Sequence, residues 1–148
     1  MKTIWVIVAN QVEAQIYSSQ QVAWNIKLFK TLLHEEGAAH ARDLVSDAPG
    51  RVHDRMGSAR HSMEPNTSVK EEGLRRFVKE IVECLEAAHR KNKFNELVIL
   101  AAPVVLGVIR KGLTSGLAHA VVKEVPKDVV GQGIDKIQVQ LKRAFELK

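Results

Sequence analysis

The chain has 148 residues, of which 45% are hydrophobic and 26% are charged, so its composition fits one globular domain and excludes a disordered chain. The single cysteine, Cys84, excludes an intrachain disulfide and is typical of a reducing compartment. The formal net charge of +5 is uneven, because residues 1–73 sum to −1 and residues 74–148 to +6. No apolar run reaches the roughly 20 residues of a membrane helix. We therefore expect a cytoplasmic protein without membrane insertion.

Three strands are predicted before residue 34. Residues 4–9 form a continuous apolar run, which is typical of a strand buried on both faces. Residues 12–17 alternate apolar and polar side chains, as a half-buried strand does, and residues 24–33 alternate in the same way. Short connections between the three segments indicate an antiparallel meander.

Hydrophobic periodicity disappears between His34 and Asn66, so we predict a long ordered loop there. This segment holds four of the six histidines of the chain. A loop of this length inside a compact domain is uncommon and is often functional. We therefore expect the functional residues in this part of the chain.

The clearest helix signal follows this segment. Ser68 and Glu71 have the spacing of a capping box, which predicts a helix start at Ser68. Behind this box apolar residues recur every three or four positions and predict one buried helix face: Leu74, Phe77, Val78, Ile81, Val82, Leu85 and Ala88. Asn92 and its neighbouring lysines end the helix.

Strands and helices alternate in the rest of the chain. We predict a strand over residues 97–102, a helix over 103–111, a helical turn near 114–117, a strand over 119–125 and a helix after Gly133. The order βββαβαβα predicts an α/β fold, with a mixed sheet of about five strands covered by helices. This order is similar to that of ribonuclease H-like folds. Residues 1–148 form a single domain in this prediction.

Carboxylates suited to nuclease chemistry are scarce on the predicted strands. A two-metal nuclease of the ribonuclease H type needs several carboxylates that converge on two divalent ions. The first predicted strand ends at Asn10, and acidic residues on or beside the strands are limited to Glu13, Glu96 and Glu124. We therefore expect no two-metal active site.

Other catalytic and metal-binding patterns are also weak. His53, Asp54, His61 and Glu64 are possible zinc ligands, but their spacing matches no zinc finger or zincin motif. Cys84 lies near the apolar face of the predicted long helix, where a buried structural thiol is the usual case. We expect no catalytic residue, no metal and no cofactor, with a hydrolase that uses the loop histidines as the enzymatic alternative.

Residues 40–65 supply the candidate binding residues. Arginine matches the paired oxygens of phosphate and carboxylate groups, so Arg51, Arg60 and His61 could form an oxyanion site. The four arginines of this segment are balanced by four acidic residues, so an internal network that ties the loop to itself is the alternative. The candidate binding residues are Arg42, Asp43, Asp47, Arg51, Asp54, Arg60, His61 and Glu64.

The same segment carries a dense motif: Arg42-Asp43-Leu44-Val45-Ser46-Asp47-x-Pro49-Gly50-Arg51, then Asp54, Gly57 and Arg60-His61-x-x-Glu64-Pro65. With Trp5-Val6-Ile7-Val8-Ala9 and Glu124-Val125-x-Lys127-Asp128, this motif resembles the signature of the bacterial host attachment family, "protein required for attachment to host cells". Two positions depart from the family pattern. Asn10 stands where many members have Asp, and Arg55-Met56 replaces a small or polar pair.

The resemblance implies a non-enzymatic, cytoplasmic interaction module that is indirectly required for attachment and recognises a protein partner through residues 40–65. The family in turn resembles the central domain of eukaryotic and archaeal peptide release factors, so a translation-associated domain that binds RNA or the ribosome is the alternative. Those factors use a Gly-Gly-Gln loop, whereas residues 40–65 contain no glutamine and Gly131-Gln132-Gly133 has another order. We therefore expect no release-factor hydrolysis; the oligomeric state stays open.

Overall fold

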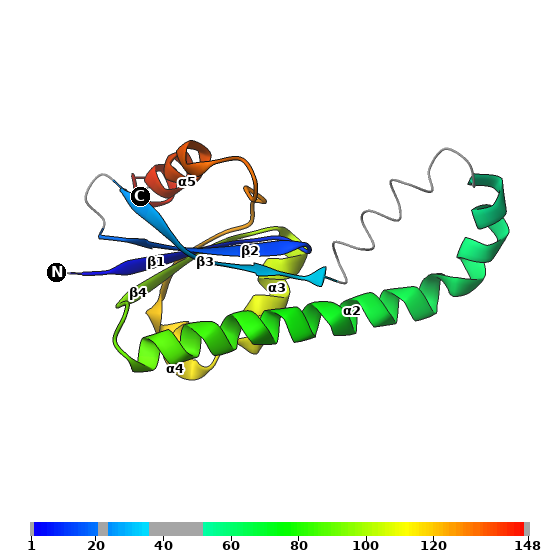
Figure 1. Ribbon diagram of the computed structural model, residues 1–148, viewed down its shortest axis with the longest axis horizontal. Helices are drawn as coiled ribbons and strands as arrows, with labels where there is room; N and C mark the ends of the chain where they lie inside the picture. The colour runs from blue at the N-terminus through cyan, green and yellow to red at the C-terminus, as the bar shows by residue number, and fades with distance from the viewer. Residues whose placement is uncertain (1, 21–23, 36–51, 147–148) are drawn as a thin grey trace.

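A five-stranded sheet lies at the centre of the computed structural model, which describes residues 2–20, 24–35 and 52–146, and for residues 52–68 the backbone alone (Figure 1). The strands are β1 (Ile4–Ala9), β2 (Glu13–Ser19), β3 (Ile26–Leu33), β4 (Glu96–Ala101) and β5 (Val121–Val125). The helices are α2 (Val52–Arg90), α3 (Pro103–Gly112), α4 (Ser115–Ala120) and α5 (Ile134–Glu146).

The sheet is mixed, and this confirms the predicted sheet type. Its strand order is β3-β2-β1-β4-β5, in which β1 pairs antiparallel with β2 and β2 antiparallel with β3. The other two pairings, β1 with β4 and β4 with β5, are parallel. With these directions, β1, β3, β4 and β5 all end at the same side of the sheet, which we call the carboxyl edge.

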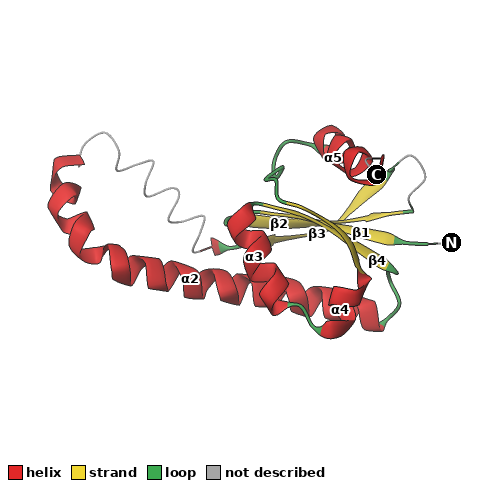
Figure 2. Ribbon diagram, turned by 180° about the vertical axis from the view of Figure 1, so that it is seen from behind, coloured by secondary structure: helices red, strands yellow, loops and turns green. Residues whose placement is uncertain are grey.

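Helices cover both faces of the sheet (Figure 2). On one face α2, α3 and α4 pack over residues such as Ile7, Ile16 and Ile99, and on the other face α5 packs over residues such as Val6 and Leu100. The predicted alternation within residues 12–17 is confirmed from Glu13 to Ile16, where Ala14 and Ile16 are buried and Glu13 and Gln15 are partly exposed. Tyr17 departs from it, because it is buried on the face that α5 covers.

The long helix α2 departs most from the prediction. It begins at Val52, so residues 52–66 are helical and Ser68 lies inside the helix instead of capping it. Its predicted apolar face from Leu74 to Ala88 is confirmed as buried. At 1.5 Å per residue its 39 residues span about 58 Å, and its N-terminal part extends beyond the carboxyl edge (Figure 1).

A bend is visible in the N-terminal part of α2 (Figure 1). Pro65 lies inside this helix and has no backbone N–H to donate to the carbonyl four residues earlier. Prolines at interior helix positions are among the usual causes of such bends. The helix therefore continues through a residue that commonly ends one.

The remaining boundaries lie close to the predicted ones. β3 begins at Ile26, two residues later than predicted, because Trp24 has a left-handed backbone with φ of 50°. The turn near residue 114 is extended into helix α4, and β5 begins only at Val121. α3 begins at Pro103 as predicted.

Candidate functional site

The structure covers half of the candidate binding residues. Arg42, Asp43, Asp47 and Arg51 lie outside the described residues. Asp54, Arg60, His61 and Glu64 lie in α2, within about three turns of one helix. The predicted loop therefore needs correction from residue 52 onward, since these four residues are positions on a continuous helix that projects past the carboxyl edge (Figure 1).

His34, the residue after β3, contacts both the turn between β1 and β2 and the helix α2. It directly follows β3, and its backbone N–H donates to the Val12 carbonyl oxygen at 2.8 Å. Its Nδ1 lies 2.7 Å from the Gln11 carbonyl oxygen, so Nδ1 is the donor of this hydrogen bond. The imidazole also stacks on the Phe77 ring of α2, with centroids 4.9 Å apart and planes at 12°. His34 therefore ties the β1–β2 turn to α2.

A groove of about 210 Å³ lies beside His34, between the end of β3 and α2. Its lining combines an apolar base with charged residues: Leu33, His34, Glu35, Gly73, Arg76, Phe77 and Glu80. Leu33 is 59% exposed, which is high for a leucine at the end of a strand. Arg76 pairs with Glu72 one turn earlier, at 3.6 Å. The groove thus offers apolar contact and charges of both signs at the carboxyl edge.

Asn10 and Asp128 join two loops at the same edge. The Asn10 side-chain oxygen accepts hydrogen bonds from the backbone N–H groups of Val12 and Glu13, at 2.8 and 2.9 Å. Its amide nitrogen donates to the two Asp128 carboxylate oxygens, at 3.3 and 3.2 Å. Asp128 also accepts from the Val130 backbone N–H at 3.1 Å. These bonds hold the turn after β1 against the loop after β5.

A second pair stabilises the side of the edge formed by α3 and β5. Arg110 of α3 donates from Nε to the Glu124 carboxylate at 2.6 Å, and the Glu124 side chain is half-buried. α3 itself begins directly after β4, where the Ala102 N–H donates to the Ala9 carbonyl oxygen at 3.1 Å. The edge is therefore held by specific polar contacts on both sides of β1.

These contacts decide what the described part of the edge can do chemically. The Asp128 carboxylate is engaged by Asn10 and by a backbone amide, so its oxygens serve to join loops. Within the described ranges, no three His, Cys, Asp or Glu side chains are arranged to hold a metal ion. The edge carries a groove beside His34, and a second hollow of about 320 Å³ lies along α2 between Val69 and Arg75.

Sequence reasoning did not assign a role to His34 or Asp128. His34 was recognised only as one of the histidines of a predicted loop, and Asp128 only as part of a motif. A usable signal exists for His34, because it directly follows a predicted strand that runs in the same direction as the first strand, and the ends of such strands meet at one edge of a sheet. The pairing of Asn10 with Asp128, 118 residues apart, has no local sequence signal.

Fold and site together define an α/β fold with a groove at the carboxyl edge of a mixed sheet and a long helix that extends beyond this edge. Residues 5–141 match the family described as "Protein required for attachment to host cells", and the chain belongs to this family. The predicted family is thereby confirmed over most of the chain.

A curated relative is the uncharacterized protein of Rickettsia prowazekii (strain Madrid E), which is 38% identical over 77 residues. This match covers 51% of the present chain and 51% of the relative, so it spans about half the length of that protein. In the described part of the chain, no helix has both the length and the apolar character needed to cross a membrane.

Proposed function

We propose that this chain is a non-enzymatic interaction module that serves host attachment indirectly and recognises a protein partner at the carboxyl edge. The recognition surface consists of residues 40–65 together with the groove beside His34. Membership of the host attachment family gives the biological setting. The observation that carries the proposal is the groove. It lies between the end of β3, which precedes residues 40–65 in the chain, and α2, which contains residues 52–65.

The groove suits a peptide or protein surface better than a small reactive substrate. Its lining joins the apolar side chains of Leu33 and Phe77 to the charged side chains of Glu35, Arg76 and Glu80. Protein interfaces commonly combine an apolar centre with a polar rim of this kind. The stacked His34 and Phe77 rings give the base a fixed shape, which lowers the entropy cost of binding.

Helical geometry supports the assignment of residues in the first part of α2. At about 100° per residue, positions 54, 60, 61 and 64 fall within roughly a third of the helix circumference. Arginine and histidine at two of these positions suit a carboxylate or phosphate on the partner. The proposal therefore assigns Arg60 and His61 to an oxyanion contact, with Asp54 and Glu64 beside them.

The proposal includes a ribonuclease H-like fold and a cytoplasmic location. Three sequential antiparallel strands followed by two parallel strands support the fold assignment. The absence of any possible intrachain disulfide is in keeping with a reducing compartment. Fractionation of cells that produce the protein tests the location.

A translation-associated domain that binds RNA or the ribosome is the second candidate function. The observation that favours it is the charge of residues 74–148, which sum to +6. Binding of this kind falls steeply with salt, because each neutralised phosphate releases counterions. Sedimentation of the protein with ribosomes at low and high salt tests it.

Affinity capture with the full chain tests the first proposal. Arg60→Lys keeps the charge but removes the paired N–H geometry, so the captured partner should bind more weakly by about 1–3 kcal/mol. Arg143→Lys is the matched control, because Arg143 is exposed on α5, across the sheet from α2. The proposal fails if Arg60→Lys lowers the melting temperature markedly and leaves the captured partner unchanged.

A further inference from the structure

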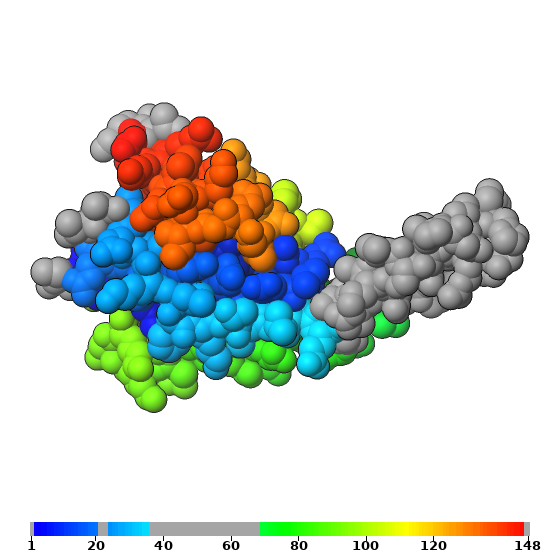
Figure 3. Space-filling view, turned by 45° about the horizontal axis from the view of Figure 1, so that its top comes forward, coloured from blue at the N-terminus to red at the C-terminus, as the bar shows by residue number. Residues whose placement is uncertain are grey.

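The edge strand β3 presents an exposed surface along most of its length, and its last residue, Leu33, lines the groove. Every β3 residue except Ile26 and Leu32 is exposed, and β2 is its single neighbour among the described strands. In the space-filling view β3 lies on the surface between α5 and the C-terminal part of α2 (Figure 3). The strand carries two lysines and no acidic residue.

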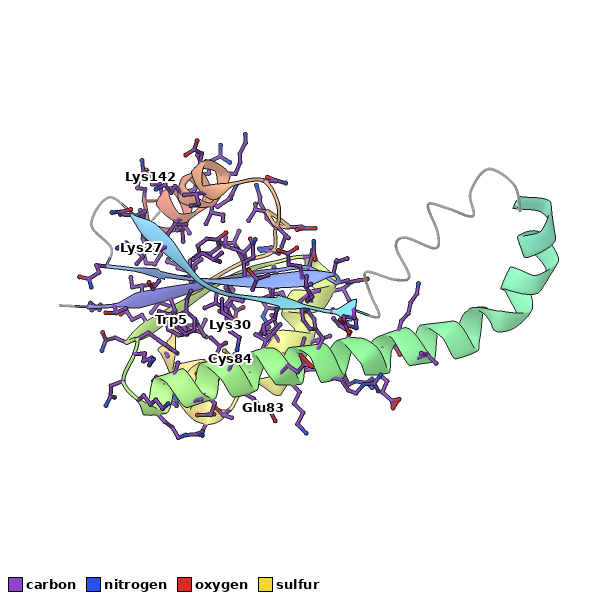
Figure 4. All side chains as sticks on the ribbon, viewed as in Figure 1. Trp5, Lys27, Lys30, Glu83, Cys84 and Lys142 are labelled. Carbon is purple, nitrogen blue, oxygen red and sulfur yellow. The ribbon has the colours of Figure 1, made fainter. Side chains whose placement is uncertain are left out.

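Strand register places both lysines on the face that α2 covers. Ser18 pairs with Trp5 on one side and with Lys27 on the other, so these residues form one row across the sheet. Ile16 likewise pairs with Ile7 and with Lys30. Trp5, Ile7 and Ile16 belong to the core beneath α2, and Figure 4 shows Trp5 and Lys30 on this side of the sheet.

A bulge brings Phe29 onto the same face. The register passes from Tyr17–Leu28 directly to Ile16–Lys30, so Phe29 is the extra residue of β3. Its ring contacts the buried Trp5 indole, with centroids 4.6 Å apart. Bulges commonly re-aim side chains in this way. Lys27, Phe29 and Lys30 therefore share one face, although strict alternation would separate Phe29 from Lys30.

Phe29 is the outer member of a row of rings in contact, and its ring is tilted by 40° against the Trp5 indole. Trp5 also stacks on Phe94 at 4.9 Å, and Phe94 on His89 at 5.1 Å. Trp5 and Phe94 are buried, whereas Phe29 is 48% exposed. The inner rings thus hold a partly exposed aromatic ring in a fixed position.

Three lysines share this part of the surface. Lys93, from the loop after α2, places its Nζ 5.8 Å from the Phe29 ring centroid, and the register places Lys27 and Lys30 on the same face of β3 as Phe29. The ion pairs formed among described residues involve none of these three lysines. We call Lys27, Phe29, Lys30 and Lys93 the Phe29 patch. Its chemistry, an aromatic ring among uncompensated cations, suits a polyanion with planar groups.

Strand addition is the competing use of an edge strand. A bulge and lysines are two of the features by which edge strands avoid pairing with another strand, and β3 has both. The side-chain face of the Phe29 patch is therefore a better binding surface than the backbone of β3. Cations combined with an aromatic platform are the features by which proteins bind single-stranded nucleic acid without sequence preference.

We propose that the Phe29 patch binds single-stranded nucleic acid, with a base stacked on Phe29 and neighbouring phosphates held by Lys27, Lys30 and Lys93. This proposal gives the second candidate function, RNA or ribosome binding, a specific site. It rests on that function for the biological role of the binding, but not for the binding itself. Lys27 lies in the row of Trp5 near the start of β1, and Lys30 in the row of Ile7 at its middle. The patch and the groove share no residue, so loss of one site should leave the other intact.

Fluorescence anisotropy with purified protein and a labelled oligouridylate of about 12 nucleotides tests the proposal, with an oligothymidylate of equal length as the DNA arm. Three phosphate contacts predict a slope of about −2 in a plot of log affinity against log salt concentration. Phe29→Leu should weaken binding about tenfold or more, because it keeps an apolar contact with Trp5 but removes the stacking ring. Lys27→Gln and Lys30→Gln should each make the salt slope shallower by about 0.7.

Two controls separate this site from a general effect. Leu28→Ala changes an exposed apolar residue on the opposite face of β3, and Lys79→Gln removes an exposed lysine of α2; both should bind as the unchanged protein does. The lysine variants keep the test decisive if Phe29→Leu fails to fold. Absence of binding to both oligonucleotides at low salt overturns the proposal. Equal binding of polyglutamate and the oligonucleotides, unaffected by Phe29→Leu, also overturns it.

Discussion

The Asn10 amide nitrogen donates to both carboxylate oxygens of Asp128, while the Asn10 side-chain oxygen accepts from two backbone N–H groups. A side-chain amide donates through its nitrogen and accepts through its oxygen, whereas an ionised carboxylate only accepts. A carboxylate at position 10 would accept from the backbone but would repel Asp128. Asn10 therefore fits its partner chemically.

Replacement of Asn10 by Asp should destabilise the fold. The change removes the donor to Asp128 and places two carboxylates together, which should lower the free energy of unfolding by about 1–2 kcal/mol at neutral pH. Chemical denaturation measures this. The exchange variant with Asn10→Asp and Asp128→Asn should recover most of the loss, because donor and acceptor then face each other again. Equal stability of the single and the exchange variants would contradict this account.

The pH dependence of Asn10→Asp gives a second, independent readout. Two like charges raise the pKa of at least one carboxyl above its unfolded value, so the folded state of this variant is relatively favoured at low pH. Its deficit in unfolding free energy should therefore shrink as the pH falls through this raised pKa, and the change should be complete below the unfolded pKa of about 4. Urea titrations of the variant and the unchanged protein at several pH values measure this, and a deficit independent of pH argues for simple loss of a hydrogen bond.

Tyr17 should titrate above the ordinary pKa of 10.0 for tyrosine. Burial is the larger cause of the raised pKa and the Glu13 charge is the smaller. Its stabilising contribution is complete below pH 10 and is lost as the pH rises through the raised pKa. Because Tyr17 is the single tyrosine of the chain, tyrosinate absorbance reports on it alone. Tyr17→Phe should flatten the alkaline stability profile, and Glu13→Gln should lower the pKa only slightly.

Two glycines should respond to alanine in opposite ways. Gly107 lies inside α3, and a Cβ there would meet no atom within 4 Å, so Gly107→Ala should raise stability by about 0.5–1 kcal/mol. Gly133 precedes α5 with φ of +96°, a backbone that L residues rarely adopt. Gly133→Ala should therefore lower stability by about 1 kcal/mol or more. Thermal unfolding of both variants measures the contrast, and a shift of the same sign would contradict it.

The strands and the buried helix face could be predicted because their patterns come from burial itself. The apolar run of β1 and the spacing from Leu74 to Ala88 reflect the two faces that must leave water. The start of α2 could not be predicted in this way. Val52 to Ser68 extends past the sheet, so no core imposes an apolar period on it, and Pro65 is typical of a helix end. The capping-box spacing of Ser68 and Glu71 then gave a plausible but wrong start.

The candidate site was predictable in part. Asp54, Arg60, His61 and Glu64 were identified from residue type and motif, but a loop was expected where they lie on a helix. The pairs Asn10–Asp128 and His34–Phe77 depend on how distant segments meet. The side-by-side position of Phe29 and Lys30 depends on a bulge, which neither alternation nor propensity indicates.

Site-specific photocrosslinking in cells that produce the protein tests the central claim most directly. A benzophenone amino acid at position 61 of α2 should yield a discrete covalent adduct with a protein partner. The same amino acid at position 142, an exposed site on α5 (Figure 4), should yield none. Adducts at position 142 without adducts at position 61 would show that recognition takes place elsewhere on the molecule and would contradict the account.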